Sequence, residues 1–282
     1  MIHSILHPTD LSVGNDAAFL HALRIALDVK GDLTILHSQD LPSDDEADWH
    51  SFPAVRTALV RWGLLLEDAP QSAVAQQLGV RITKAQLYDA SPIGAVVRWL
   101  RTHPCDLVVL ATHARDGMDR WLRGSVAADL AQIARLPTLF LPVSSPGFVD
   151  PNGGTALIRN VLIPIDREPL PGAAVALAFD LIDSCGGGDA LMHLLHVGAP
   201  EEAPTISIDP KQDRRLRRHA RRGAVADAII GLAQELEPEL IVMPTYGRHG
   251  FLDALRGSTT EQVLRQAKRP LLAVPAADET SS

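Results

Sequence analysis

The sequence contains an internal duplication, which limits the folds that the chain can adopt. Four segments of the first half recur in the same order in the second half, at a period of about half of the 282 residues. Solenoid repeats are shorter, on the order of 20 to 50 residues, so this period indicates a duplicated domain. The matched pairs are ILHPTD (5–10) with VLIPID (161–166), DLTILHS (32–38) with ALMHLLHV (190–197), DLVVLATHA (106–114) with ELIVMPTYG (239–247), and RGSVAADLAQIARLPTLFLPV (123–143) with RGSTTEQVLRQAKRPLLAVP (256–275).

Each copy alternates between short apolar runs and helical patterns. Continuous apolar runs predict strands that are buried on both faces, and the stretches between them have helical periodicity. The predicted strands of the first copy are 2–7, 33–37, 107–111 and 137–143, and its predicted helices are near 14–29 and 92–102. This alternation predicts an α/β fold in which each copy is a mainly parallel, Rossmann-like sheet with helices on both faces.

The copies differ in their middle and are separated by a linker. The first copy is longer, because it has an acidic loop, DLPSDDEAD (40–48), followed by an amphipathic helical stretch near 49–78. The second copy has a proline-rich turn in that place. A run rich in proline, glycine and serine, VSSPGFVDPNGG (143–154), separates the copies. The predicted domains are therefore residues 1–146 and 155–277.

Composition and charge exclude several classes of protein. The formal charge of −8 makes nucleic acid a poor candidate partner, because binding to its phosphates needs a basic face. The exception is RRLRRHARR (214–222), which is either a site for an anionic partner or a solvated edge strand or helix face. Two cysteines, Cys105 and Cys185, are too few for a disulfide framework, and no apolar run approaches the length of a membrane span. We therefore expect a cytoplasmic protein.

The glycine-rich element of the second copy, YGRHGFLDALRGSTT, points to an anion site. It forms the pattern P-x-x-G-x9-G-S-T from Pro244 to Thr259 and runs into a helical pattern, so free N–H groups and a positive helix end would face the loop. Gly257 lets a phosphate approach the backbone, and Gly247 can take a positive φ. The alternative is that Gly257 and Ser258 only form a helix N-cap. Recurrence in register with the other repeated elements favours a shared pocket.

Two further repeated elements are expected at the same edge of the sheet. Asp10 and Asp166 each follow a buried strand, and open parallel sheets bind ligands at the carboxyl ends of their strands. A carboxylate there can accept a hydrogen bond from an exocyclic amine such as adenine N6, or it can cap the following helix. The second strand of each copy ends in a histidine, and the next residue, Ser38 or Val197, would offer backbone groups to a ligand.

The sequence contains no reactive constellation. Neither half has a G-x-S-x-G nucleophile elbow, a G-x-x-x-x-G-K-S/T phosphate loop or a paired metal-ligand motif. His193 and His196 are three residues apart on a predicted strand, so they point to opposite faces and are poorly placed to share a zinc ion. His249 could contact a phosphate or assist slow hydrolysis, and a solvated loop histidine is the alternative.

The ordered set of these elements resembles the universal stress protein family. The resemblance covers nearly the whole chain and is carried by PTD and PID, the histidine-ended strands, and the glycine-rich elements before LPTLFLPV and RPLLAVP. It implies five mainly parallel strands per domain, and adenine-nucleotide binding where G-x-x-G-x9-G-S/T is kept. It also implies that the two last strands, at 137–143 and 270–275, meet within this chain as a pseudo-dimer.

The resemblance assigns roles to residues of the second half. Asp166 would contact the adenine, and Val197 would meet it through its backbone. The residues that would hold the phosphates are Gly247, Gly257, Ser258 and Thr259. Pro244 stands where the family has its first glycine, and because proline has no N–H and a fixed φ, the motif is partial.

The first half is a more altered copy. The matching residues there are Asp10, Ser38, Gly124, Ser125 and Val126. Both loop glycines are replaced, by Ala111 and Ala114. Outside glycine a positive φ costs about 1 kcal/mol or more. We therefore expect the second half to be the better nucleotide site.

The leading interpretation is an adenine-nucleotide-binding protein with a role in stress response or regulation. Its ligand would be ATP, or ADP or AMP, with Mg²⁺ accompanying the nucleotide. Whether the protein also hydrolyses ATP slowly is left open by the sequence. The second interpretation is a protein-interaction module whose pockets have decayed. The expected partners are the nucleotide, a second copy in a homodimer and an unidentified regulatory protein.

Overall fold

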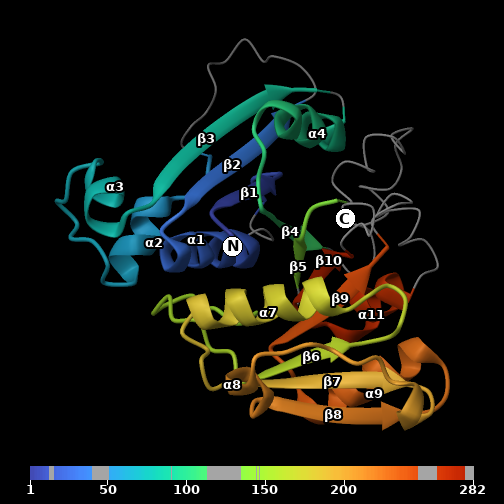
Figure 1. Ribbon diagram of the computed structural model, residues 1–282. Coiled ribbons are helices and arrows are strands. Elements are labelled where there is room, and N and C mark those ends of the chain that lie inside the picture. The colour runs from blue at the N-terminus through green and yellow to red at the C-terminus, as the bar shows by residue number, and fades with distance from the viewer. Residues whose placement is uncertain are drawn as a thin grey trace.

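A single sheet organises the protein. The computed structural model describes residues 1–12, 16–39, 51–89, 91–112, 135–143, 145, 147–246 and 259–276. Within them ten strands form one sheet in the order β3-β2-β1-β4-β5-β10-β9-β6-β7-β8 (Figure 1). The predicted α/β fold is confirmed, because neighbouring strands are parallel everywhere except at the centre.

The two halves of the chain use their elements in the same sequence. The first half contains β1 (Ser4–Thr9), α1 (Asp16–Val29), β2 (Asp32–Gln39), α2 (Val55–Arg61), α3 (Ala73–Leu78), β3 (Arg81–Tyr88), α4 (Pro92–Thr102), β4 (Leu107–Thr112) and β5 (Thr138–Pro142). The second half contains β6 (Asn160–Pro164), α7 (Gly172–Ser184), β7 (Leu191–Val197), η2 (Pro200–Glu202), α8 (Pro210–Asp213), β8 (Leu216–Arg221), α9 (Val225–Leu236), β9 (Leu240–Thr245), α11 (Thr259–Ala267) and β10 (Leu271–Pro275).

The halves meet at the last strand of each. β5 and β10 pair antiparallel, with Leu139 opposite Leu272. Counted outward from this central pair, the five strands of each half follow in the same order. The predicted meeting of these two strands is confirmed. Pairing of this kind covers two sheet edges that would otherwise be exposed for association with other chains.

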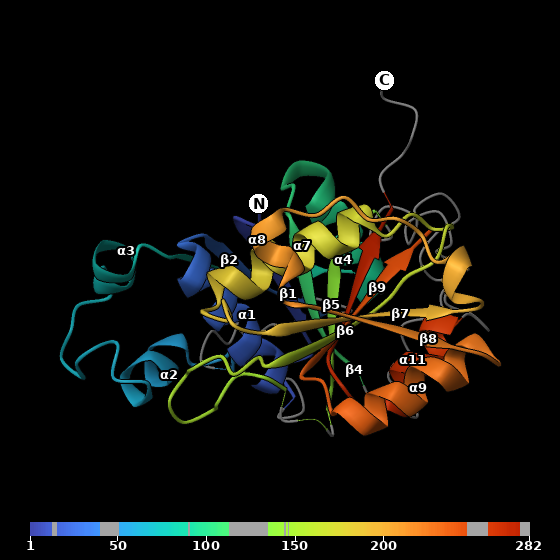
Figure 2. The same ribbon diagram turned by 60° about the horizontal axis from the view of Figure 1, so that its bottom comes forward.

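Helices cover both faces of the sheet. α1, α2 and α7 pack into one apolar cluster with one face, and α4, α9 and α11 cover the other face (Figures 1 and 2). Side chains alternate along a strand, so Ile5 faces α1 while the next residue, Leu6, faces α4. This double burial explains why the strands read as continuous apolar runs.

Two regions differ from the sequence prediction. β3 and β8, the two edge strands, are not apolar runs, because much of their surface faces solvent. The helical stretch expected near 49–78 is two short helices, α2 and α3. The first of them ends at Arg61, and Gly63 then takes a φ of +70°, which is left-handed and cannot continue a right-handed helix. Pro70 lies in the connection to α3.

The predicted linker is packed against the first half. His21 of α1 accepts hydrogen bonds at Nε2 from Phe148 N (2.8 Å) and Val149 N (3.2 Å), while its Nδ1 donates to Ala17 O (2.7 Å). Trp62 Nε1 donates to Pro151 O at 3.1 Å. These contacts fix the path between the halves through side chains that lie far away in the sequence.

Candidate functional site

The candidate site lies where two neighbouring strands separate. β6 pairs with β9 only through Val161 and Leu162, and β1 pairs with β4 only through Ile5 and Leu6. Beyond these residues the ladders end, so the strands are free to diverge towards their carboxyl ends. The strand order reverses at the same two places, which is where open α/β sheets bind ligands.

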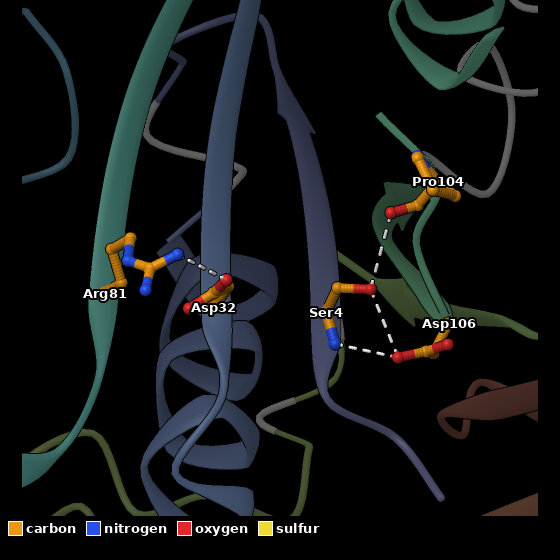
Figure 3. Close-up of polar contacts among 5 residues, drawn as sticks. All are labelled: Ser4, Asp32, Arg81, Pro104 and Asp106. Carbon is orange, nitrogen blue, oxygen red and sulfur yellow. Dashed lines mark hydrogen bonds and ion pairs between the residues drawn. The ribbon is translucent and has the colours of Figure 1, made fainter. Parts of the chain in front are cut away.

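The opposite, amino-terminal ends of these strands are held together by carboxylates. Asp106 Oδ2 accepts hydrogen bonds from His3 N at 2.8 Å. It also accepts from Ser4 N at 2.8 Å and from Ser4 Oγ at 3.1 Å (Figure 3). Burial alone would raise the pKa of Asp106, but these hydrogen bonds outweigh it and hold the pKa below its usual value. Glu239 Oε2 accepts from Asn160 N at 2.8 Å in the second half. Each pair of strands is thus fixed at one end and open at the other.

A cavity of about 310 Å³ lies at the open end of the second half. It is bounded by the ends of β6, β7 and β9, by the loop after β6, and by the starts of α9 and α11. Its lining residues are Pro164, Ile165, Asp166, Glu168, Pro169, Leu195, Val197, Val225, Ile229, Met243, Pro244, Thr245, Tyr246, Thr259 and Thr260. Its volume is within the usual range of small-molecule sites.

One side of the cavity is acidic. The loop after β6 contributes two carboxylates, Asp166 and Glu168, and Tyr246 extends β9 beside them. Burial, Glu168 and Asp166 together raise the pKa of the Tyr246 phenol. This side therefore favours a ligand group that donates hydrogen bonds.

The other side of the cavity contains two helix N-termini. Val225 is the first residue of α9, and Thr259 and Thr260 begin α11. α9 begins without a side-chain cap. Unpaired N–H groups and the positive end of the helix dipole favour an anion at such a position. Between the two sides the lining is apolar, with Leu195, Ile229 and Met243.

Four residues predicted from the second copy line this one cavity. They are Asp166, Val197, Pro244 and Thr259, which come from four separate elements or loops of the second half. Gly247, Gly257 and Ser258 lie outside the described residues. Asp166 Oδ1 accepts from Arg167 N at 2.8 Å. The alternative that Asp166 caps the next helix is wrong, since α7 begins only at Gly172 and has no side-chain cap.

In the first half, three predicted residues lie at the corresponding strand ends. Asp10 follows β1, Ser38 is near the end of β2, and Ala111 is near the end of β4. Asp10 Oδ1 accepts from Ser12 N at 2.9 Å, and Ser38 Oγ donates to Asp89 O at 3.3 Å. The remaining predicted residues, Ala114, Gly124, Ser125 and Val126, lie outside the described residues.

The strand-end histidines hold the first and second strands together. His37 Nδ1 lies 2.9 Å from Thr9 O, and His196 Nδ1 lies 3.4 Å from Ile165 O, so in each half an imidazole N–H donates to the residue just before the repeated aspartate. His193 has different partners, with its Nδ1 3.0 Å from His219 Nε2. Among the described residues no group of three or more His, Cys, Asp or Glu side chains is suited to a metal ion.

The arginine run is β8 and the residues before and after it, on the outer edge of the sheet. Arg218 pairs with Asp213, and Arg221 pairs with Glu235. Arg215 is buried. Carboxylates of the same chain thus neutralise part of the positive charge that an anionic partner would use, and the edge-strand alternative describes this segment.

Several residues of the cavity were not predicted from the sequence. Glu168 lies outside the repeated segments, Tyr246 lies inside one but is matched by His113 in the first copy, and Thr245 was passed over although it lies inside the P-x-x-G segment and recurs as Thr112. Strand alternation could have identified Thr245, because it shares a face with Met243 and lies at the carboxyl end of its strand.

Comparisons with known proteins agree with the fold and the repeated elements. The universal stress protein family model matches residues 1–142 and 209–275. A universal stress protein of Mycobacterium tuberculosis is 24% identical over an alignment of 297 positions, gaps included, that covers 96% of each chain. The crystal structure of a universal stress protein from Archaeoglobus fulgidus superimposes with a TM-score of 0.59 at 19% identity, covering 98% of this chain and 97% of that one.

A universal stress protein solved in complex with cAMP covers 51% of this chain at a TM-score of 0.32, too low a similarity to assign a ligand here. In the described part of the chain, no helix is long and apolar enough to cross a membrane. The family model covers well over half of the sequence, in both halves. The chain belongs to the universal stress protein family.

Proposed function

We propose that the second-half cavity binds an adenine nucleotide, with ATP as the expected ligand, and that the protein acts in stress response or regulation. The observation that carries this proposal is the polarity of the cavity. It has carboxylates on one side, two helix N-termini on the other, and apolar side chains between them.

An adenine nucleotide has the matching chemistry. Its exocyclic amine can donate to Asp166, its base can lie against apolar side chains such as Leu195 and Met243, and its phosphates can accept from the start of α11. Guanine has a carbonyl oxygen at C6 in place of that amine, so in the same pose this oxygen would face the carboxylate without a hydrogen bond. Gly247, Gly257 and Ser258 are expected to complete the phosphate side, as the family resemblance implies.

Mg²⁺ would enter with the nucleotide. Mg²⁺ prefers oxygen ligands and commonly binds through substrate phosphates, and since Asp166 meets the base in the proposed pose, the phosphates would hold the metal. The metal would neutralise charge on the phosphates. The side chains of this chain would orient the base and the phosphate tail.

We infer that the first half, residues 1–146, is the weaker nucleotide domain, and residues 155–277 the stronger one. Ala111 and Ala114 replace the loop glycines, and Asp10 already accepts from its own loop at Ser12. The interaction-module alternative predicts that neither half binds nucleotide. A cytoplasmic location, a homodimer and a regulatory protein partner belong to this proposal too.

Thermal unfolding with and without ATP tests the proposal. A ligand at about 100 times its Kd stabilises the folded state by about 2.7 kcal/mol, which raises Tm by several degrees in a chain of this size. We expect ATP to raise the Tm of the natural protein and GTP to raise it far less.

Two matched variants locate the site. Asp166→Ala is expected to lose most of the ATP-dependent rise in Tm, whereas Asp10→Ala, the equivalent change in the first half, is expected to keep it. An equal rise in both variants would show that the Asp166 carboxylate does not recognise the ligand, and no rise in the natural protein would favour the interaction module.

A further inference from the structure

Thr245 has an unusual environment at the end of β9. The residue is only 7% exposed and lines the cavity. Its hydroxyl Oγ1 is buried and makes no hydrogen bond within the part of the chain that the structure describes. A buried hydroxyl without a partner is destabilising and uncommon, so its retention calls for a physical reason.

Two other buried threonines at the ends of strands satisfy their hydroxyls locally. Thr9 Oγ1 accepts from Leu11 N at 3.0 Å, and Thr138 Oγ1 donates to Leu136 O at 3.1 Å. Threonine readily bonds to nearby backbone in this way. The unsatisfied hydroxyl of Thr245 is therefore a property of its place in the cavity.

Thr245 ends a strand that lies next to the strands leading to both expected ligand contacts. β9 lies between β6, which leads to Asp166, and β10, which follows α11. Thr245 shares the sheet face of Met243, which packs in the same cluster as α9 and α11. Thr245 thus lines the cavity from the strand between β6 and β10, together with apolar residues such as Ile229.

We propose that Thr245 is a specificity-determining residue whose hydroxyl hydrogen-bonds a ribose hydroxyl of the bound nucleotide. The inference rests on the proposed function. A nucleotide whose base meets Asp166 and whose phosphates meet α11 has its sugar between them. A ribose hydroxyl both donates and accepts, as Thr245 Oγ1 does, so the pair satisfies two groups at once. A site built this way discriminates against ligands that lack the hydroxyl.

The test compares the affinities of ATP, 2′-deoxy-ATP and 3′-deoxy-ATP by isothermal titration. The natural protein is expected to bind ATP about 5- to 20-fold more tightly than at least one deoxy analogue, the effect of one hydrogen bond in a poorly solvated pocket. Thr245→Val is expected to weaken ATP binding by a similar factor and to abolish the preference. Thr245→Ser, which keeps the hydroxyl, is expected to retain it.

Controls separate recognition from folding. Without nucleotide, Thr245→Val is expected to melt no lower than the natural protein, because it removes an unsatisfied polar group. Thr112→Val, the same change at the end of β4, is expected to leave ATP affinity unchanged. Equal ATP affinity of the natural protein and Thr245→Val overturns the inference alone, as does a preference that survives the substitution. Failure of the natural protein to bind ATP overturns the proposed function and this inference with it.

Discussion

Replacing Arg215 by methionine is expected to lower the free energy of unfolding by about 2 to 4 kcal/mol. The guanidinium is buried, and it donates from Nε to Ala190 O at 2.9 Å and from Nη2 to Gly187 O at 2.9 Å. It also pairs with Asp183 at 2.6 Å and lies over the Phe179 ring, 5.1 Å from its centroid. Methionine fills the space but leaves these acceptors without a donor.

The same arginine run provides a matched control. Arg218 pairs with Asp213, but both side chains are mostly exposed, so Arg218→Met is expected to change stability by no more than about 0.5 kcal/mol. Arg215→Lys keeps the charge but lacks the planar set of donors, and is expected to lose much of the stability as well. Urea unfolding at neutral pH measures all three. Equal effects at the two arginines would contradict the structural role assigned to Arg215.

Acidification from pH 6.5 to pH 4 is expected to destabilise the protein through His7 and His21. Burial lowers the pKa of each imidazole to about 4, against 6.5 for the unfolded chain, and a backbone carbonyl that accepts from its Nδ1 opposes this only in part. The unfolded chain therefore binds more protons in this window. The stabilisation is fully present above pH 6.5 and is lost as the pH falls towards 4, by about 3 kcal/mol for each histidine.

His7→Ile isolates one of these groups. Isoleucine is the natural choice because Ile163 occupies the matching position in VLIPID. The variant is expected to show a shallower fall of unfolding free energy between pH 6.5 and 4, by close to one proton, when urea unfolding is measured across the range. His21→Leu should flatten the curve by a similar amount and also lower stability at pH 7, because Phe148 N and Val149 N lose their acceptor. Curves parallel to that of the natural protein would refute this origin of acid sensitivity.

The sequence indicated the centre of the fold better than its edges. Strands such as β1 and β9 are buried on both faces, so their apolar runs are unambiguous. β3 and β8 have one exposed edge, and sequences such as LRRHAR have no apolar pattern by which to identify them. The packing of the linker depends on His21 and Trp62, whose proximity to it arises only from tertiary structure.

The candidate site was predictable where it was repeated. Asp166, Val197 and Thr259 recur in register with the first copy, and the structure brings them to one cavity. Glu168 has no such signal, because it lies outside the repeated segments, and Tyr246 is matched by a different residue, His113, in the first copy. Repetition identifies what both copies share, whereas the features specific to one pocket require coordinates.

Isothermal titration of the full chain with ATP shows whether the second half holds the nucleotide. We expect one ATP per chain, bound at sub-millimolar concentration. Binding should be abolished by the double change Gly257→Glu/Ser258→Glu, which places negative charge where the phosphates are expected, and retained with Gly124→Glu/Ser125→Glu in the first half. No heat from the natural protein, or loss of binding in the first-half variant with retention in the second-half variant, would contradict this expectation.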